Sequence, residues 1–156
     1  MSAKIAPGEK APAFKLPAAG GGEVSLGDFK GRKLVLYFYP KADTSGCTIE
    51  AKDFSKLAPA FARAGAAILA VSADPVPKLD RFKAKHDLTI PLASDESHAT
   101  LEAYGAWAKK SLYGRSYMGI LRNTLLIDPQ GKIARIWEKV RVAGHAAEVL
   151  EAAKEL

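Results

Sequence analysis

Short apolar runs and segments of helical periodicity alternate along the chain. Residues 34–39 form an unbroken apolar and aromatic run that is too short for a typical helix and rich in strand formers, so they predict a strand covered on both faces. Residues 66–71 predict a second buried strand. Between the two runs, four apolar residues recur at helical spacing: Phe54, Leu57, Ala58 and Phe61. Two buried strands joined by a helix predict a parallel pair with a right-handed crossover.

The segment before the first buried strand predicts an extended cover. Three prolines, Pro7, Pro12 and Pro17, keep residues 7–33 extended. Three consecutive glycines at 20–22 mark a turn between the short runs 14–16 and 23–26. This pattern predicts an N-terminal β-hairpin.

The second half of the chain predicts an alternation of helices and strands. The predicted elements are a helix around residues 78–86, a short edge strand over 90–95, a helix over 97–104, an antiparallel hairpin of 123–127 and 132–137, and an amphipathic helix over 144–156. Residues 105–122 are expected to form the longest irregular segment, and such loops are often functional. The order of elements predicts one α/β domain, residues 1–156, with a mixed central sheet flanked by helices.

Cys47, the only cysteine, lies where the first buried strand gives way to a helix. Pro40 stops the strand, and Asp43, Thr44 and Ser45 are of the types that cap helix N-termini, so Cys47 falls in the first helical turn. Unpaired N–H groups and the positive end of the helix dipole favour an anion there, hence the thiolate. A lone cysteine is commonly a small buried hydrophobe, but this placement favours a reactive thiol.

The cysteine count and the absence of targeting signals indicate a compartment. A chain of 156 residues with one cysteine forms no internal disulfide, which favours a reducing environment. The N-terminus lacks the apolar core of a secretory signal, and no apolar run is long enough to span a bilayer. We therefore expect a soluble, cytoplasmic protein.

The net charge of +6 raises the possibility of a polyanionic partner. One stretch has basic residues interleaved with tyrosines: Lys109, Lys110, Tyr113, Arg115, Tyr117 and Arg122. Elsewhere the charges are scattered, and no base-stacking motif is present, so a solvated basic surface is the simpler interpretation. We do not expect nucleic acid or a membrane as a partner.

The three histidines, His86, His98 and His145, are dispersed along the chain. None has metal-ligand spacing with Cys47, and no histidine is placed by sequence to act as the base of a Cys-His hydrolase. The sequence therefore predicts no metal site, and no motif calls for a cofactor.

The spacing Pro40-x-x-x-Thr44-x-x-Cys47 resembles the active-site motif of the peroxiredoxins. Further strings, Tyr-Phe-Tyr-Pro-Lys, Thr-Ser-Gly-Cys-Thr, Val-Ser-Ala-Asp, Tyr-Met-Gly-Ile and Arg-Asn-Thr-Leu-Leu-Ile-Asp, are similar to the peroxiredoxin Q group, also called bacterioferritin comigratory protein. The similarity covers about residues 8–155. It implies a thioredoxin-like fold, a monomer, and a thiol peroxidase that reduces hydrogen peroxide and organic hydroperoxides.

The resemblance also implies the residues of the site. It assigns the peroxidatic thiol to Cys47, a hydroxyl partner to Thr44, a shielding proline to Pro40 and a guanidinium to Arg122, which precedes the predicted strand 123–127. Glu50 is a candidate to orient Arg122. The alternative for Glu50 is a solvent-facing acid that the helix dipole favours.

The chain departs from the resemblance where a second cysteine is expected. Relatives often carry a resolving cysteine five residues after the first, or in the following helix, and those positions are Lys52 and about Lys83 here. Ser45 also stands where many relatives have a proline. A sulfenic acid on Cys47 would then need an external thiol, either thioredoxin or glutathione with glutaredoxin. The alternative function is a redox-sensing or chaperone-like binding protein that Cys47 oxidation switches.

Overall fold

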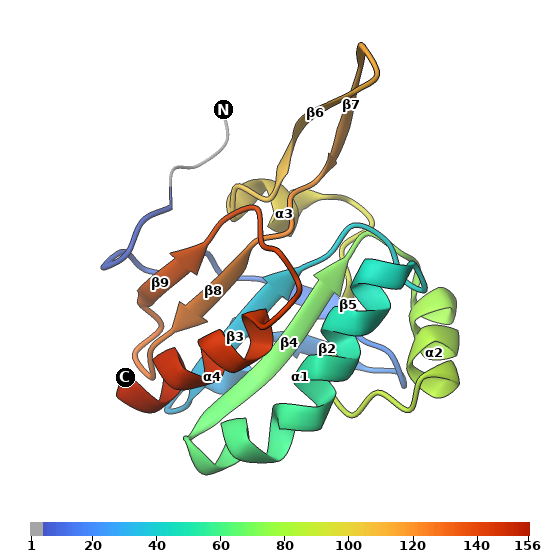
Figure 1. Cartoon of the computed structure of the whole chain (residues 1–156). Coiled ribbons are helices and arrows are strands. Elements are labelled where there is room, and N and C mark those ends of the chain that lie inside the picture. Colours follow the sequence, from blue (N-terminus) through green and yellow to red (C-terminus); the bar gives the residue numbers. More distant parts are fainter. Residues whose placement is uncertain (1–4) are drawn as a thin grey trace.

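The structure, a computed structural model, describes residues 5–156 and is built on a five-stranded mixed sheet (Figure 1). In spatial order the strands are β5 (Leu92–Ser94), β4 (Ala66–Ser72), β3 (Lys33–Phe38), β8 (Thr124–Ile127) and β9 (Ile133–Trp137). β3 pairs in parallel with β4, and β4 with β5, whereas β8 runs antiparallel to both β3 and β9. The predicted parallel pair, edge strand and hairpin are confirmed.

Three helices cover one face of this sheet, and the N-terminal segment and a short fourth helix cover much of the other. The helices are α1 (Ser45–Arg63), α2 (Val76–Lys85), α3 (Ala99–Ala103) and α4 (His145–Glu155). One core cluster joins the sheet to α1, α2 and α4, and a second joins its opposite face to the N-terminal segment and α3. Within residues 5–156, no helix has the length and apolar character needed to cross a bilayer.

The N-terminal hairpin is confirmed. β1 (Lys15–Pro17) pairs antiparallel with β2 (Glu23–Ser25), and a 3₁₀ turn, η1 (Leu26–Phe29), follows. All three glycines at 20–22 have positive φ, between 78° and 94°, where a side chain would be strained. The hairpin buries Leu16 and Val24 against the sheet.

The prediction of an irregular segment over residues 105–122 is wrong. These residues form a second hairpin, β6 (Trp107–Leu112) and β7 (Arg115–Ile120), which projects from the rest of the protein (Figure 1). Its two-residue turn, Tyr113 and Gly114, has positive φ at both positions, as type I′ hairpin turns require. Most of the hairpin buries neither face, so its strands lack the apolar alternation that would have revealed them.

Candidate active site

Cys47 lies at the junction of β3 and α1, in the first turn of the helix. α1 begins at Ser45, with Thr44 as an extended N-cap residue, so Cys47 falls in the first turn as expected. The Cys47 side chain is 2% exposed and belongs to the core cluster on the helical face of the sheet. The sulfur is therefore both near the positive end of a helix dipole and shielded from bulk water.

A buried carboxylate holds the loop between β3 and α1. The Ala42 N–H donates to Asp74 Oδ2 at 2.8 Å, and the Ser72 hydroxyl donates to the same oxygen at 2.8 Å. Lys78 forms an ion pair with Asp74 Oδ1 at 3.2 Å. Sequence reasoning did not single out Ser72 or Asp74 for this task, although both lie in the string Val-Ser-Ala-Asp.

A second anchor ties the same loop to α2. Asp43 has a positive φ of 64°, and its carboxylate receives His86 Nε2 at 2.7 Å and Lys85 Nζ at 2.9 Å. The hydrogen bonds from His86 and then Lys85 lower the pKa of Asp43. The turn before Cys47 is thus held from two sides.

Arg122 reaches the site from the link between β7 and β8. Its carbonyl accepts from the Val140 N–H at 2.8 Å. The next residue, Asn123, is 4% exposed; its carbonyl accepts from the Phe38 N–H at 2.9 Å and its side chain accepts from the Lys139 N–H at 3.0 Å. These bonds fix the backbone that carries Arg122 beside the end of β3.

The guanidinium of Arg122 joins the sulfur to a buried carboxylate. Nη2 lies 3.3 Å from Cys47 Sγ, and Nη1 lies 2.5 Å from Glu50 Oε1. Glu50 is 1% exposed, so its interpretation as a solvent-facing acid is wrong. A Cβ at Gly46 would lie 3.4 Å from Nη2, which shows how closely the guanidinium approaches the first turn of α1.

Burial and mutual attraction shift the pKa values of Glu50 and Arg122. Burial raises the pKa of Glu50 to about 7, although Arg122 opposes the rise. The second Glu50 oxygen has no hydrogen-bond partner among residues 5–156, which explains why burial prevails. For Arg122, burial works against the charge, but Glu50 and Cys47 outweigh it and raise its pKa. A permanent cation therefore lies against the sulfur.

Thr44 and Pro40 lie on the solvent side of the site. The Thr44 hydroxyl donates to the Lys41 carbonyl at 2.8 Å, so its hydrogen is directed to the loop, and its oxygen remains able to accept. Pro40 is exposed and directly precedes the loop that Asp43 and Asp74 hold. The Thr44 oxygen is thus available as an acceptor, and Pro40 is open to solvent.

Aromatic side chains form the wall on the sheet side. Tyr37 stacks on Phe54 with ring centroids 4.7 Å apart and lies 5.9 Å from Tyr39. Both tyrosines are 1% exposed, and burial raises the pKa of each. In this setting the interaction between the sulfur and Arg122 is screened less than at a surface.

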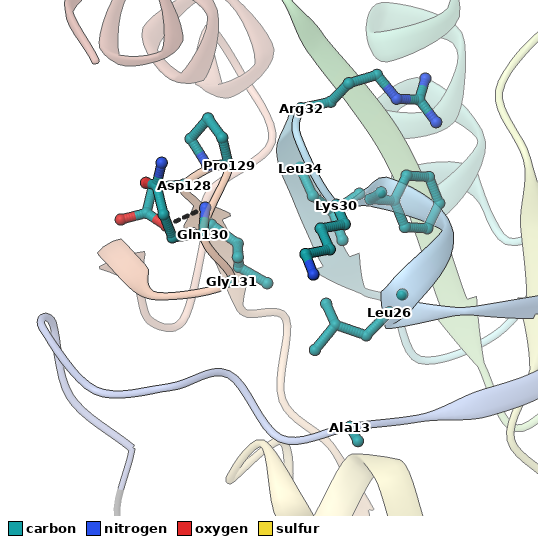
Figure 2. A pocket seen from close by; sticks show the side chains of 12 residues that line it. Ala13, Leu26, Lys30, Arg32, Leu34, Asp128, Pro129, Gln130 and Gly131 are labelled. Carbon is teal, nitrogen blue, oxygen red and sulfur yellow. Dashed lines mark hydrogen bonds between the residues drawn. The ribbon is translucent and has the colours of Figure 1, made fainter.

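A separate pocket lies away from the sulfur. Its volume is about 220 Å³. Leu26, Leu34 and Pro129 are among the residues that line it (Figure 2). Leu34 lies near the start of β3, whereas Cys47 follows the end of that strand. Within residues 5–156, no group of three or more His, Cys, Asp or Glu side chains is placed to hold a metal ion.

Three comparisons show which known proteins this chain is similar to. Residues 7–136 match the AhpC/TSA family. A putative peroxiredoxin bcp of Coxiella burnetii is 46% identical over 143 residues, 92% of this chain and 95% of the relative; peroxiredoxin Bcp of Bacillus subtilis is 44% identical over 149 residues, 96% and 95%. A solved structure of Xanthomonas campestris peroxiredoxin Q has a TM-score of 0.90 at 42% identity, covering 96% of this chain and 97% of that one. The chain belongs to the AhpC/TSA family and, within it, to the Bcp or peroxiredoxin Q group of peroxiredoxins, with a thioredoxin-like fold and a single cysteine.

Proposed function

We propose that the Cys47 thiolate reduces hydrogen peroxide and organic hydroperoxides, and that an external thiol then restores it. The observation that carries this proposal is the Arg122 guanidinium, 3.3 Å from a shielded sulfur and oriented by Glu50. A Xanthomonas campestris relative, bacterioferritin comigratory protein, is described as having alkyl peroxide reduction activity; it is 42% identical with a TM-score of 0.90. The chain is a peroxiredoxin, a thiol-dependent peroxidase.

The oxidation step transfers two electrons from sulfur to the peroxide. The Cys47 thiolate attacks the terminal peroxide oxygen, an S–O bond forms and the O–O bond breaks. The departing hydroxide or alkoxide takes up a proton and leaves as water or an alcohol. Cys47 remains as a sulfenic acid.

Ionisation of the thiol accounts for only a small part of such a rate. A free thiol is a few per cent ionised at neutral pH, so full ionisation gains about thirtyfold, or about 2 kcal/mol. Enzymes commonly lower barriers by at least about 8 kcal/mol. We assign the rest of the barrier reduction to groups that stabilise the charge developing on the sulfur and the two peroxide oxygens. These groups are the Arg122 guanidinium, the Thr44 oxygen as acceptor for the peroxide proton, and the Cys47 N–H. Pro40, which has no N–H, would keep water from the sulfur.

Regeneration requires two thiols from outside the chain, because Cys47 is its only cysteine. The first thiol condenses with the sulfenic acid to give a mixed disulfide and water. The second thiol attacks that disulfide and releases the Cys47 thiol. Thioredoxin, or glutathione with glutaredoxin, is the expected donor in the cytoplasm, and the enzyme would act as a monomer without nucleic acid.

The test is peroxide consumption by the purified protein with each donor. We expect turnover with at least one of thioredoxin, or glutathione plus glutaredoxin, and none in Cys47→Ser, whereas Ser111→Ala, a change on the exposed hairpin, keeps the parent rate. No turnover with any thiol, or full turnover in Cys47→Ser, would overturn the proposal. The redox-sensing or chaperone-like alternative is not favoured, and a sensor would react once without cycling.

A further inference from the structure

Exposed apolar side chains concentrate on the β6–β7 hairpin. Among residues 5–156, six large hydrophobic side chains are exposed, and four of them belong to this hairpin: Leu112 (56%), Tyr113 (95%), Tyr117 (48%) and Met118 (51%). A fifth, Ile49, is 53% exposed and lies two residues after Cys47, just past the first turn of α1. Apolar exposure of this kind marks interaction surfaces in soluble proteins.

The strand register places apolar and basic residues together on one face of the hairpin. Lys110 is opposite Tyr117, and Leu112 is opposite Arg115, so alternation puts these four side chains on the same side. The Lys110 stem covers Gly119, where an added Cβ would lie 3.0 Å from Lys110 Cδ and 3.4 Å from Tyr117 Cε2. We call Lys110, Leu112, Arg115 and Tyr117 the hairpin face.

The hairpin that carries this face is rooted beside the residue that contacts the reactive sulfur. β7 ends at Ile120, only two residues before Arg122, so the hairpin is rooted at the site. Burial and the neighbouring Arg122 lower the pKa of Lys110, whereas Cys47 raises it. Lys110 therefore shares the electrostatic environment of both site residues.

The segment that carries this face is purely basic. Between Glu102 and Asp128 there is no acidic residue, and the charges are those of Lys109, Lys110, Arg115 and Arg122. Such a surface attracts an acidic partner and disfavours a second copy of itself, because like charges would meet across a symmetric interface. The partner is therefore expected to be acidic and partly apolar.

Regeneration of Cys47 requires an external thiol to bind close to this hairpin. The sulfur is 2% exposed in the only cysteine of the chain, so any thiol that clears its oxidised form must approach from the surface around the first turn of α1. We propose that the hairpin face is the docking surface for an acidic dithiol protein that reduces oxidised Cys47. This inference rests on the proposed function.

The reaction at this surface balances with the two thiols of one partner. The first partner thiol condenses with the Cys47 sulfenic acid, which forms a disulfide between the two proteins and releases water. The second partner thiol attacks the partner sulfur of that bond. Cys47 leaves as a thiol, and the partner leaves oxidised as an internal disulfide.

The test compares a protein donor with a small one. We use Arg115→Glu, with Arg63→Glu at the exposed far end of α1 as a matched charge reversal. With an acidic thioredoxin as donor, we expect Arg115→Glu to raise the donor KM by about tenfold and to weaken its salt dependence. Turnover with dithiothreitol and single-turnover oxidation by peroxide should stay within about twofold of the parent. Leu112→Ser, which removes apolar surface without a charge change, should raise the same donor KM.

Several results would overturn the docking proposal alone. One is an equal donor KM in Arg115→Glu and Arg63→Glu, and another is equal loss of activity with dithiothreitol, which would assign the hairpin to the site itself. Hairpin-dependent dimerisation, or hairpin-dependent binding to duplex DNA or to vesicles of acidic lipid with no effect on the donor KM, would also overturn it. Failure of the parent protein to react with peroxide would instead overturn the proposed function.

Discussion

At the residue scale, the site depends on the planar fork of Arg122. One nitrogen of the fork faces the sulfur and another faces Glu50, so a single side chain couples a nucleophile to a buried carboxylate. Only a guanidinium presents several donors in fixed relative directions. The two contacts therefore orient the cation for the peroxide as well as for the thiolate.

Arg122→Lys should separate charge from geometry. Lysine keeps the positive charge but cannot make both contacts at once, and loss of one oriented donor to a developing anion commonly costs about 10²–10³ in rate. We expect a loss of that size in the rate constant for Cys47 oxidation, measured by stopped flow with one equivalent of peroxide. Arg63→Lys, at the exposed end of α1, should react like the parent. Parent-like oxidation in Arg122→Lys would show that charge alone is sufficient.

Glu50→Gln should remove a pH-dependent component from the rate of Cys47 oxidation. Burial raises the pKa of Glu50 to about 7, so the carboxylate that orients Arg122 is present above this pH and is lost below it. Oxidation of Cys47 should slow as pH falls through 7, and Glu50→Gln should lack this component. Above pH 7 the variant should be slower by about tenfold or more, because hydrogen bonds between charged groups contribute about 1.5–3 kcal/mol.

Glu50 also makes the free energy of unfolding depend on pH, in a direction that follows from its raised pKa. An ordinary glutamate ionises near 4.5, so between 4.5 and about 7 the folded protein holds a proton that the unfolded chain releases. The contribution of Glu50 to the free energy of unfolding should fall as pH rises through this window, and Glu50→Gln should lack that fall. Glu96→Gln, an exposed change, is the control. Identical profiles for the parent and Glu50→Gln would contradict both expectations.

At the element scale, the start of α1 depends on the loop that precedes it. Asp74 accepts from the Ala42 N–H and the Ser72 hydroxyl inside the protein, and Asp43 joins the loop to α2. The buried anchor contributes more, because the Asp43 contacts are open to solvent, which screens exposed ion pairs.

Asp74→Ala should destabilise the protein and misplace the sulfur. It leaves a buried N–H and a buried hydroxyl without their acceptor, which we expect to lower the free energy of unfolding by about 2–4 kcal/mol in urea denaturation. Cys47 oxidation should slow in the same variant. Asp74→Asn keeps a carbonyl acceptor and should recover most of both losses, and Glu96→Ala should show neither. An unaltered oxidation rate in folded Asp74→Ala would show that the anchor does not position the sulfur.

At the scale of the whole molecule, the order of the strands assembles the site. β8 runs antiparallel to β3 with Thr124 opposite Tyr37, so the residue two positions before Thr124 lies beside the end of β3. That residue is Arg122. α1 begins at the same end of the sheet, which brings Cys47 to a cation 75 residues away in the sequence.

A second, introduced cysteine can test whether the first turn of α1 unwinds when Cys47 is oxidised. In a regular helix, Cα atoms five residues apart are about 8.6 Å from each other, beyond the roughly 7 Å that a disulfide allows. In Lys52→Cys, one equivalent of peroxide should give an internal disulfide only if the first turn of α1 unwinds after oxidation. We expect this product, seen by mass spectrometry as a loss of two hydrogens, and none in Lys56→Cys, one turn further along α1. A persistent sulfenic acid in Lys52→Cys would show that the turn stays folded.

Much of the fold is visible in the sequence because burial has a local signature. The apolar runs at 34–39 and 66–71 became β3 and β4, the helical spacing after Cys47 became α1, and the Asp128-Pro-Gln-Gly turn joins β8 to β9. The β6–β7 hairpin escaped prediction because it is stabilised by backbone pairing and a turn, with little burial to mark its strands. Residues 97–104 contain only the short helix α3, which starts after His98 in a left-handed conformation.

The sequence by itself determined that one cysteine would begin a helix after a buried strand, since apolar periodicity, Pro40 and capping residues act over a few positions. Only the tertiary structure decided that Arg122 faces the sulfur, that Glu50 is buried beside it and that Asp74 holds the loop. These contacts depend on which strands are neighbours, and the pairing of β3 with β8 joins segments far apart in the chain. Local patterns carry no information about the distance between such segments, so the site emerges only when the sheet is assembled.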